Sequence, residues 1–431
     1  MALSTAGAGL APARVRRARI AVSAFFLTNG ALYANLLPRF PEVKDAFGLS
    51  NTLYGLAVVA FPLGAILIGA LPARAIRRFG SGPVAGLGTV LLCACVAAAG
   101  AGAGPGAGTG IGLGVFLVAM FLGGALDAHV DTAQNAQGMD VQRARGRSII
   151  NSLHALWSLG AVAGGLMGTA ALVLGVPLAW HLLGSGLLWS AVALVALPST
   201  LTRAEGTALR TVEPDATTTA APGDSRPARD PVPARDPVPA GAGRGGAGRV
   251  VVGRLLPVAV IAIAGVMIED VGANWSAVYL TAELRAPLAA AGLGLVAMMA
   301  AQFVGRMLGD PMTDRWGRVA VARAGAALSA AGMLLVVLAP GPAAAVAGFA
   351  LAGFGCATLV PAAYHAADDL PGLKPGTGLA LVSWLMRISF LSLSPAVGAL
   401  SDAAGLRWAL VVVPVFALVA VLMAGVLRAR P

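Results

Sequence analysis

Residues 122–147 read LGGALDAHVDTAQNAQGMDVQRARGR and continue an almost wholly apolar run that begins at residue 110. This pattern predicts a membrane helix that carries carboxylates into the bilayer and ends in an arginine cluster. Carboxylates are costly in hydrocarbon, so they normally face a bundle interior or a water-filled cavity. Asp127, Asp131, Gln134 and Asn135 stand at i, i+4, i+7 and i+8, which places them on one helical face. We therefore expect the rest of the chain to provide a cavity for this face.

The composition of the whole chain is that of an integral membrane protein. Of its 431 residues, 58% are hydrophobic and 11% are charged, whereas about a quarter of the residues of soluble proteins are charged. An all-α membrane protein is predicted. Apolar runs that can cross about 30 Å of hydrocarbon recur twelve times, at residues 18–38, 52–71, 83–101, 110–139, 148–174, 177–197, 255–281, 288–309, 319–339, 343–367, 375–399 and 407–427.

The basic residues predict the orientation in the membrane. Most of the 30 Lys and Arg residues fall in alternate connections, which places both termini and the central linker in the cytoplasm. The net charge of +11 is spread over these short loops without a nucleic-acid motif, so no nucleic-acid partner is expected. The three cysteines lie in apolar helices without a CxxC pattern, which indicates no disulfide framework and no metal site. No cofactor is predicted.

The second half of the chain repeats the first. Arg78-Phe79-Gly80 matches Arg315-Trp316-Gly317, and a shift of 230 residues pairs Gly168 with Gly398. Duplicated sets of membrane helices are the architecture of secondary transporters, with the solute site where the halves meet. Between the halves, a Pro-, Ala- and Arg-rich stretch cannot bury a core and is predicted to be a disordered tether. The predicted divisions are a cytoplasmic tail (1–17), an N-terminal six-helix bundle (18–197), a cytoplasmic linker (198–252) and a C-terminal six-helix bundle (253–431).

The sequence Gly-Asp-Pro-Met-Thr-Asp-Arg-Trp-Gly-Arg at 309–318 resembles the loop signature of the major facilitator superfamily. Within that superfamily, the acidic fourth helix and the run Asn-Ser-Leu-His-Ala-Leu-Trp-Ser-Leu-Gly at 151–160 are most similar to the fucose-permease-like group. The resemblance implies a fold of two pseudo-symmetric six-helix bundles. It also implies a charged cytoplasmic latch that is closed when the cavity faces outward.

That latch can be assigned only in the second half. Arg77 stands where the second half has Asp314, so the first-half copy lacks the acidic residue of the signature. A pair between Arg306 and Asp310 across one helical turn is also expected. The predicted latch residues are Arg306, Asp310, Asp314, Arg315 and Arg318.

Asp127 and Asp131 are the predicted proton-coupling residues. Two carboxyls about 6 Å apart in a poorly solvated cavity raise each other's cost of ionisation, so at least one should bind a proton near neutrality. The alternative for each is a structural hydrogen bond to a neighbouring helix.

Arg387 is the one cation placed deep in a predicted helix of the second half, so it should pair with Asp127, Asp131, Glu269 or Asp270, or bind an anionic group of the solute. Amides and aromatic rings on several predicted helices suit sugar-like or aromatic solutes. Ordinary helix packing is the alternative for each of them. The predicted solute-binding residues are Asn29, Asn35, Gln134, Asn135, His154, Trp157, Asp270, Asn274, Trp275, Tyr364, Trp384 and Arg387.

The sequence thus predicts a secondary active transporter that moves a small sugar-like, polar or amphipathic solute by alternating access, in symport with protons. Drug or metabolite efflux by the same fold and a transport-dead receptor or scaffold are the alternatives. No hydrolase motif and no nucleotide-binding P-loop occurs, so an enzyme is not expected. One chain supplies both halves, which predicts a monomer. The abundance of Arg, Ala and Gly indicates a bacterial source and hence the cytoplasmic membrane.

Overall fold

Twelve long apolar helices make up most of the part of the chain that the structure describes. The computed structural model describes residues 10–68, 71–104, 110–147, 149–211, 244–368, 370 and 377–428. Within these residues, 12 helices are long and apolar enough to cross a membrane, one in each predicted run. The predicted number and order of membrane helices are therefore confirmed.

The first bundle contains the helices of the N-terminal half. Its first membrane helix continues through a short 3-10 turn into α2, and the second is divided into α3 and α4. Its elements are α1 (Pro12–Ala34), η1 (Leu37–Arg39), α2 (Phe40–Ala46), α3 (Asn51–Val58), α4 (Ala60–Ile68), α5 (Pro72–Phe79), α6 (Ser81–Gly102), α7 (Gly110–Arg145), α8 (Ile150–Val173), α9 (Leu178–Ala196), η2 (Leu197–Ser199) and α10 (Arg203–Thr211).

The second bundle contains the helices of the C-terminal half. Its elements are α11 (Arg244–Asn274), α12 (Ser276–Val278), the π-helical η3 (Tyr279–Glu283), η4 (Leu288–Ala290), α13 (Leu293–Trp316), α14 (Arg318–Val337), α15 (Pro342–Cys356), α16 (Leu359–Asp368), α17 (Thr377–Ala404), α18 (Leu406–Ala409), α19 (Val412–Met423) and η5 (Ala424–Leu427).

The internal repeat is visible in the backbone. Gly80 has φ 88° and ψ 156°, and its counterpart Gly317 has φ 81° and ψ 151°. A side chain at positive φ would be strained, so glycine is the residue that allows this sharp turn between two helices. The connection between the helices predicted at 288–309 and 319–339 is shorter than expected, because α13 continues through Pro311 and ends only at Trp316, immediately before this glycine.

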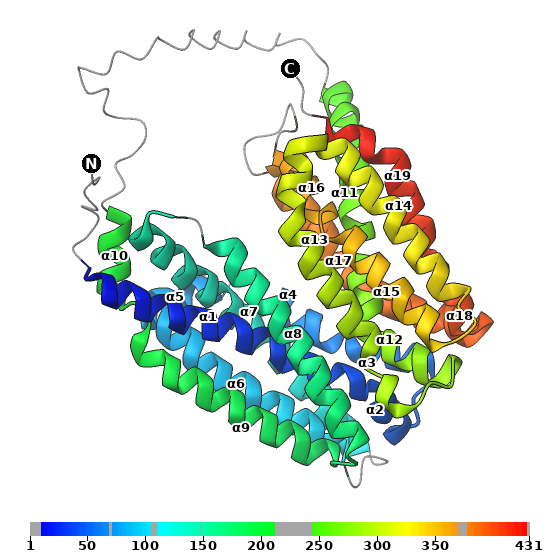
Figure 1. Ribbon diagram of the computed structural model, residues 1–431, viewed down its shortest axis with the longest axis horizontal. Helices are drawn as coiled ribbons and strands as arrows, with labels where there is room; N and C mark the ends of the chain where they lie inside the picture. Colours follow the sequence, from blue (N-terminus) through cyan, green and yellow to red (C-terminus); the bar gives the residue numbers. More distant parts are fainter. Residues whose placement is uncertain are drawn as a thin grey trace.

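The two bundles form the arms of a V (Figure 1). They meet near α2, α3, α12 and α18 and diverge toward the start of α1 and the end of α19. The most extensive packing between the bundles joins α3 to α17 and α8 to α13. We call the end of the molecule where α2, α3, α12 and α18 lie the joined end.

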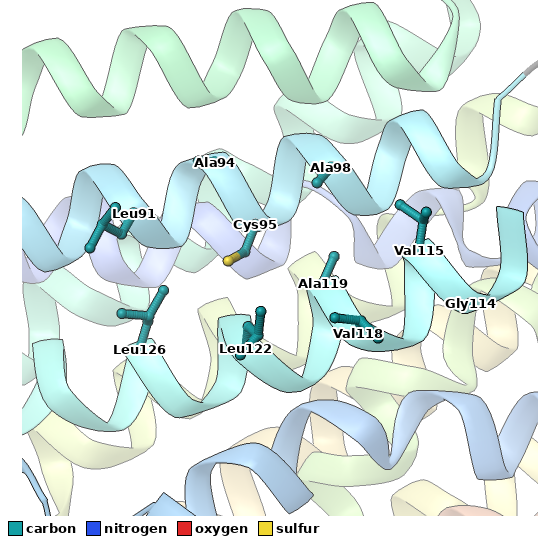
Figure 2. A pocket seen from close by; sticks show the side chains of 10 residues that line it. All are labelled: Leu91, Ala94, Cys95, Ala98, Gly114, Val115, Val118, Ala119, Leu122 and Leu126. Atoms are coloured by element: carbon teal, nitrogen blue, oxygen red, sulfur yellow. The ribbon is translucent and has the colours of Figure 1, made fainter. Parts of the chain in front are cut away.

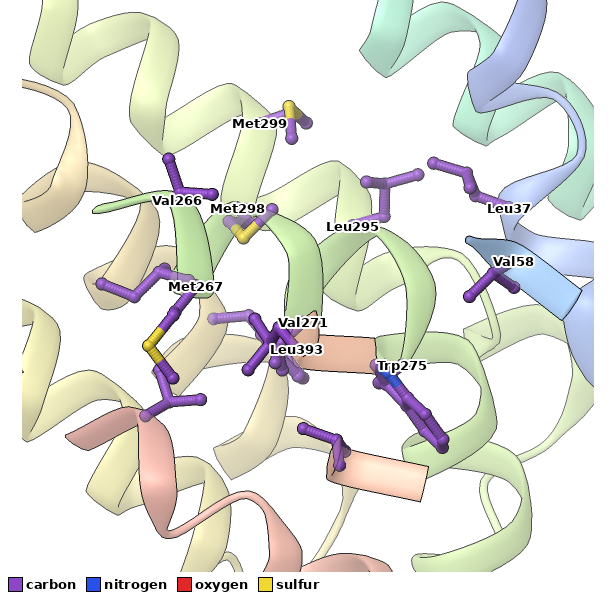
Figure 3. Close-up of a cluster of buried hydrophobic side chains, with 14 of the residues drawn as sticks. Leu37, Val58, Val266, Met267, Val271, Trp275, Leu295, Met298, Met299 and Leu393 are labelled. Carbon is purple, nitrogen blue, oxygen red and sulfur yellow. The ribbon is translucent and has the colours of Figure 1, made fainter. Parts of the chain in front are cut away.

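Apolar side chains from both bundles seal the joined end. Leu37 and Val58 of the first bundle belong to the same buried cluster as Trp275, Leu295 and Leu393 of the second (Figure 3). Burying this surface stabilises the contact by about 25 cal/mol per Å² of apolar area removed from water. In this conformation the joined end is therefore closed.

Candidate functional site

Small residues bring α1 and α8 into direct contact. A Cβ atom on Gly30 would overlap the backbone carbonyl of Trp157, and one on Gly160 would overlap that of Leu27. Close approach through small residues is how membrane helices associate tightly. The contact places polar side chains of α1 against the aromatic side chain of α8.

Asn29 links three helices through its amide group. Its Oδ1 accepts a hydrogen bond from Trp157 Nε1 at 2.8 Å, and its Nδ2 donates to Asp127 Oδ1 at 2.9 Å. The indole N–H can only donate, so it fixes which end of the amide faces Asp127. Three of the residues predicted from the sequence therefore meet in one hydrogen-bonded chain across α1, α7 and α8.

The polar side chains predicted on one face of α7 lie in different environments in the structure. Asp131 is exposed and accepts a hydrogen bond from Asn135 Nδ2 at 3.0 Å, whereas Gln134 is buried and its Nε2 lacks a partner among the described residues. The ring of His154 on α8 is exposed and interacts electrostatically with Asp131 and with Arg306 of the other bundle. Asp131, Asn135 and His154 thus lie where solvent reaches the region between the bundles, and Gln134 does not.

An ion pair in the second bundle reaches across to the first. Arg306 Nη2 lies 3.1 Å from Glu269 Oε1, which also accepts a hydrogen bond from Gln302. Arg306 Nη1 is 3.4 Å from Ser158 Oγ of the first bundle. Arg306 was predicted to belong to the latch, but in this conformation it lies at the interface of the two bundles beside the residues predicted for solute and proton binding.

Asp270 lies in a separate, buried network near the joined end. Its Oδ1 accepts from Asn274 Nδ2 at 2.9 Å, and its Oδ2 accepts from Ser394 Oγ at 2.8 Å. Ser394 Oγ in turn accepts from Trp275 Nε1 at 3.2 Å. The structure therefore brings together the three predicted residues of α11 and the segment just after it, but it buries the carboxyl and the indole.

Arg387 is exposed and has no ion-pair partner among the described residues. It stands four residues after Ser383, which donates to the Tyr364 hydroxyl at 3.3 Å, and seven before Ser394. This spacing places Arg387 on the face of α17 that contacts α11 and α16. Of the carboxylates named as its possible partners, Glu269 is paired with Arg306 and Asp270 is bonded to neutral donors. Binding of an anionic group of the solute by Arg387 stays a prediction.

Other predicted residues lie away from these groups. Asn35 is fully buried, where its amide bonds to the Ala31 carbonyl at 2.8 Å and contacts the His181 ring at 3.1 Å. Trp384 is 59% exposed beside other apolar side chains on the outside of α17.

The predicted latch lies at the end of α13. Asp314 and Arg315 are exposed there, and Arg318 begins α14. The side chain of Asp310 lies outside the described part of the structure, so its pairing with Arg306 stays a prediction.

One hollow on the outer surface has an apolar lining that does not suit a polar solute. It measures about 560 Å³ and lies between α6 and α7 (Figure 2). Leu, Ala, Val and Gly residues line it together with Cys95. Such a surface suits the acyl chains of lipid. Within the described residues, no group of three or more His, Cys, Asp or Glu side chains is placed to hold a metal ion.

Sequence reasoning missed the contact that joins the bundles most directly. Asp402 of α17 accepts hydrogen bonds from the backbone N–H groups of Asn51 and Thr52 at 2.9 and 2.8 Å, and from Thr52 Oγ1 at 2.6 Å. A carboxylate of one bundle thus caps the first turn of α3 in the other. The position of Asp402 near the end of an apolar run was the only sequence signal, and its partners lie about 350 residues away.

Comparison with known proteins agrees with this architecture. A family model described as Major Facilitator Superfamily matches residues 255–431. The chain is 29% identical over 418 residues to an uncharacterized transporter of Sinorhizobium fredii, covering 94% of this chain and 97% of the relative.

Two solved structures share the fold at low sequence identity. The nucleoside transporter NupG aligns with a TM-score of 0.68 and 9% identity over 95% of this chain and 100% of that one. The fucose:proton symporter FucP of E. coli aligns with a TM-score of 0.53 and 18% identity over 97% of this chain and 100% of that one. Twelve membrane helices among the described residues, arranged in two related bundles, give the chain the fold of these transporters, and its residues 255–431 match the Major Facilitator Superfamily.

Proposed function

We propose that this transporter moves a small polar or amphipathic solute by alternating access, in symport with protons that bind at Asp127. The observation that carries the proposal is the hydrogen-bonded chain from Trp157 through Asn29 to Asp127. This chain of hydrogen bonds holds the Asp127 carboxyl within a membrane helix, where it has no cation partner among the described residues. Carboxyls in such positions are costly and usually functional.

The present conformation corresponds to the inward-facing state of this cycle. The joined end carries Arg39, Lys44, Arg285 and Arg407, the few basic residues of the connections predicted to lie outside. The diverging arms carry the start of α1 and the end of α19 (Figure 1). We infer that both termini lie in the cytoplasm of a bacterium and that the joined end faces outward.

Proton coupling requires the proton site to communicate with the solute site. Asn29 donates to Asp127 and accepts from Trp157, so a change in the charge of Asp127 alters the orientation and strength of the hydrogen bonds at the indole. Asp131 and His154 lie on the exposed side of the same helices. They supply a second carboxyl and an imidazole that can pass the proton to water.

The side chains at the interface suit a solute with hydroxyl groups and one flat face. Trp157 and Tyr364 offer aromatic surfaces, and Asn135, His154 and Arg387 offer polar groups that are not fully buried. NupG and FucP, which have the same fold, are named as transporters of a nucleoside and of the sugar fucose. Nucleosides and sugars both fit this chemistry and are the solutes to test first.

Reconstitution in liposomes tests the proposal. Thermal shifts of the purified protein with sugars, nucleosides and organic acids identify a solute, and an imposed proton gradient should then drive its accumulation. Asp127→Asn should abolish the accumulation but retain solute exchange, because the neutral amide cannot release a proton. The exposed Asp45→Asn is the matched control and should accumulate solute normally. Accumulation by Asp127→Asn at the wild-type level would exclude Asp127 as the coupling residue.

A further inference from the structure

Among the residues that the structure describes, the buried carboxyl of Asp270 has no charged partner. Its side chain belongs to a residue that is 4% exposed, and among the described residues its two oxygens contact only the neutral donors Asn274 Nδ2 and Ser394 Oγ. An ionised carboxylate in such surroundings loses its hydration without compensation from a cation. The neutral acid is therefore favoured for as long as the residue stays buried.

The same network closes the joined end. The Tyr54 hydroxyl of the first bundle donates to the backbone carbonyl of Asn274, and its ring packs edge-on against Trp275 with 5.0 Å between the ring centroids. Trp275 donates to Ser394, and Ser394 donates to Asp270. Each residue of this network is thus connected either to the Asp270 carboxyl or to the contact between the bundles.

One buried acceptor atom in this network lacks a hydrogen-bond donor. Asn274 Oδ1 has no hydrogen-bond partner among the described residues. If Asp270 Oδ1 carried a proton and the side-chain amide of Asn274 turned by half a turn, the carboxyl O–H could donate to Asn274 Oδ1. The network in the closed conformation can therefore accommodate the protonated form of the Asp270 carboxyl.

We propose that Asp270 is a second proton-binding site, distinct from Asp127, which holds its proton while the joined end is closed and releases it to water when that end opens. The inference rests on the proposed transport cycle, in which this end opens and closes. Because burial favours the neutral acid only in the closed form, binding of the proton and closure stabilise each other.

The described ionisable groups around Asp270 come from both bundles. The phenols of Tyr33 and Tyr54 of the first bundle interact electrostatically with it. On α11 itself, Glu269 points about 100° away and pairs with Arg306. The described ionisable groups on the elements packed against α11 are Arg306, Asp314 and Arg315 of α13, Arg318 and Arg323 of α14, Cys356 of α15, Tyr364 and His365 of α16, and Arg387 and Asp402 of α17.

Distance measurements between spin labels test this proposal without a solute. Cysteines introduced at the exposed positions Asp45 and Ala404 report on the joined end, after Cys93, Cys95 and Cys356 have been replaced. In lipid nanodiscs, lowering the pH from about 8 to about 5 should shift the wild-type distribution toward the short, closed distance. Asp270→Asn should stay closed at every pH, and Asp270→Glu should restore a pH-dependent shift.

A second variant covers the case in which Asp270→Asn does not fold. Ser394→Ala keeps the carboxyl but removes a donor to its ionised form, so closure should begin at a pH higher by about one unit. A wild-type distribution that does not change with pH would overturn the proposal, and so would a full pH response in Asp270→Asn. Loss of the response in Asp127→Asn alone would assign it to Asp127. Failure of the transport proposal would appear instead as absent solute accumulation, which these distances do not measure.

Discussion

At the scale of single residues, Asn29 connects the two functions proposed for the first bundle, which are proton binding at Asp127 and solute binding at Trp157. Trp157 fixes its carbonyl oxygen, so its N–H₂ group always points at Asp127. This donor stabilises the ionised carboxylate more than the neutral acid, because hydrogen bonds to charged groups are the stronger ones. Removing it should make the proton harder to release.

Asn29→Ala should therefore move the pH profile of proton-driven uptake toward higher pH by about one unit. Initial uptake rates measured over a pH series in proteoliposomes check this shift. Trp157→Phe removes the indole N–H but leaves the bond from Asn29 to Asp127, so it should weaken solute binding and move the profile less. Identical pH profiles for Asn29→Ala and the wild type would contradict a role of Asn29 in proton release.

At the scale of helices, α3 and α17 join the bundles through two glycines. A Cβ atom on Gly55 would overlap the carbonyl of Ser394, and one on Gly398 would overlap the carbonyl of Asn51. Backbone atoms from the two bundles are thus in contact at both places. The closed joined end depends on the absence of side chains there.

Gly398→Ala should favour the open form of this end. Overpacking costs about 1–3 kcal/mol, which corresponds to a shift of roughly 5- to 150-fold in the equilibrium. Labelling of a cysteine placed at the buried Val58 by a membrane-impermeant maleimide measures it, and the rate should rise severalfold. Gly184→Ala on α9, where a Cβ atom meets nothing within 4 Å, is the control. If both variants label at the wild-type rate, the glycine contact does not limit closure.

The short helix α10 is held to α1 by an ion pair. Arg14 Nη2 lies 2.7 Å from Glu205 Oε2, and the same guanidinium donates to the carbonyls of Ser199 and Thr200. The hydrogen bonds from Arg14 hold the pKa of Glu205 below its ordinary value. A lowered carboxyl pKa means that this contact stabilises α10 above the ordinary pKa of glutamate and is lost as the pH falls through the lower, folded value.

Glu205→Gln should consequently release α10 at neutral pH. Exposed ion pairs contribute about 0.2–1 kcal/mol, so amide hydrogen exchange in residues 203–211 should become faster, up to roughly fivefold. Acidifying the wild type should produce the same acceleration, whereas the variant should show no further change. Equal exchange rates in the two proteins at neutral pH would show that the apolar contacts of Leu201 and Leu209 hold this segment without the ion pair.

The fold could be predicted from the sequence because each membrane helix is a local pattern. A run of apolar residues needs no information about distant parts of the chain to form a helix in lipid. The repeated Arg-aromatic-Gly turns at Gly80 and Gly317 were equally local, and both adopt the predicted correspondence.

The candidate site was predictable only in part, because contacts between helices depend on rotation and on conformation. The meeting of Asn29, Asp127 and Trp157 needed three helices to be turned correctly. Gln134, predicted on the same face as Asp131, is turned into the bundle. Periodicity gives the face of an isolated helix but not the neighbour that covers it, so the cap formed by Asp402 was also invisible.

At the scale of the whole molecule, the contacts between the bundles are distributed unevenly. The hydrogen bonds that Asp402 accepts from Asn51 and Thr52, and the one that Tyr54 donates to Asn274, all lie at the joined end. Away from it, among the described residues, Arg306 Nη1 donates a cross-bundle hydrogen bond to Ser158 Oγ at a long 3.4 Å. Opening the joined end therefore requires these few polar contacts to break together with the apolar seal.

Asp402→Ala should shift the whole protein toward the outward-open form. Loss of a helix cap costs about 0.5–2 kcal/mol, and a change of one or two kcal/mol alters a population by roughly 5- to 30-fold. The spin-label pair at Asp45 and the exposed Ala404 should then show a larger fraction at the long distance. Thr52→Val removes only one of the three bonds accepted by Asp402, so its shift should be smaller and in the same direction. In the proposed cycle, uptake needs both ends to open in turn. A population held outward-open should therefore also slow solute accumulation while leaving binding from outside intact. An unchanged distance distribution in Asp402→Ala would mean that the apolar seal alone keeps this end closed.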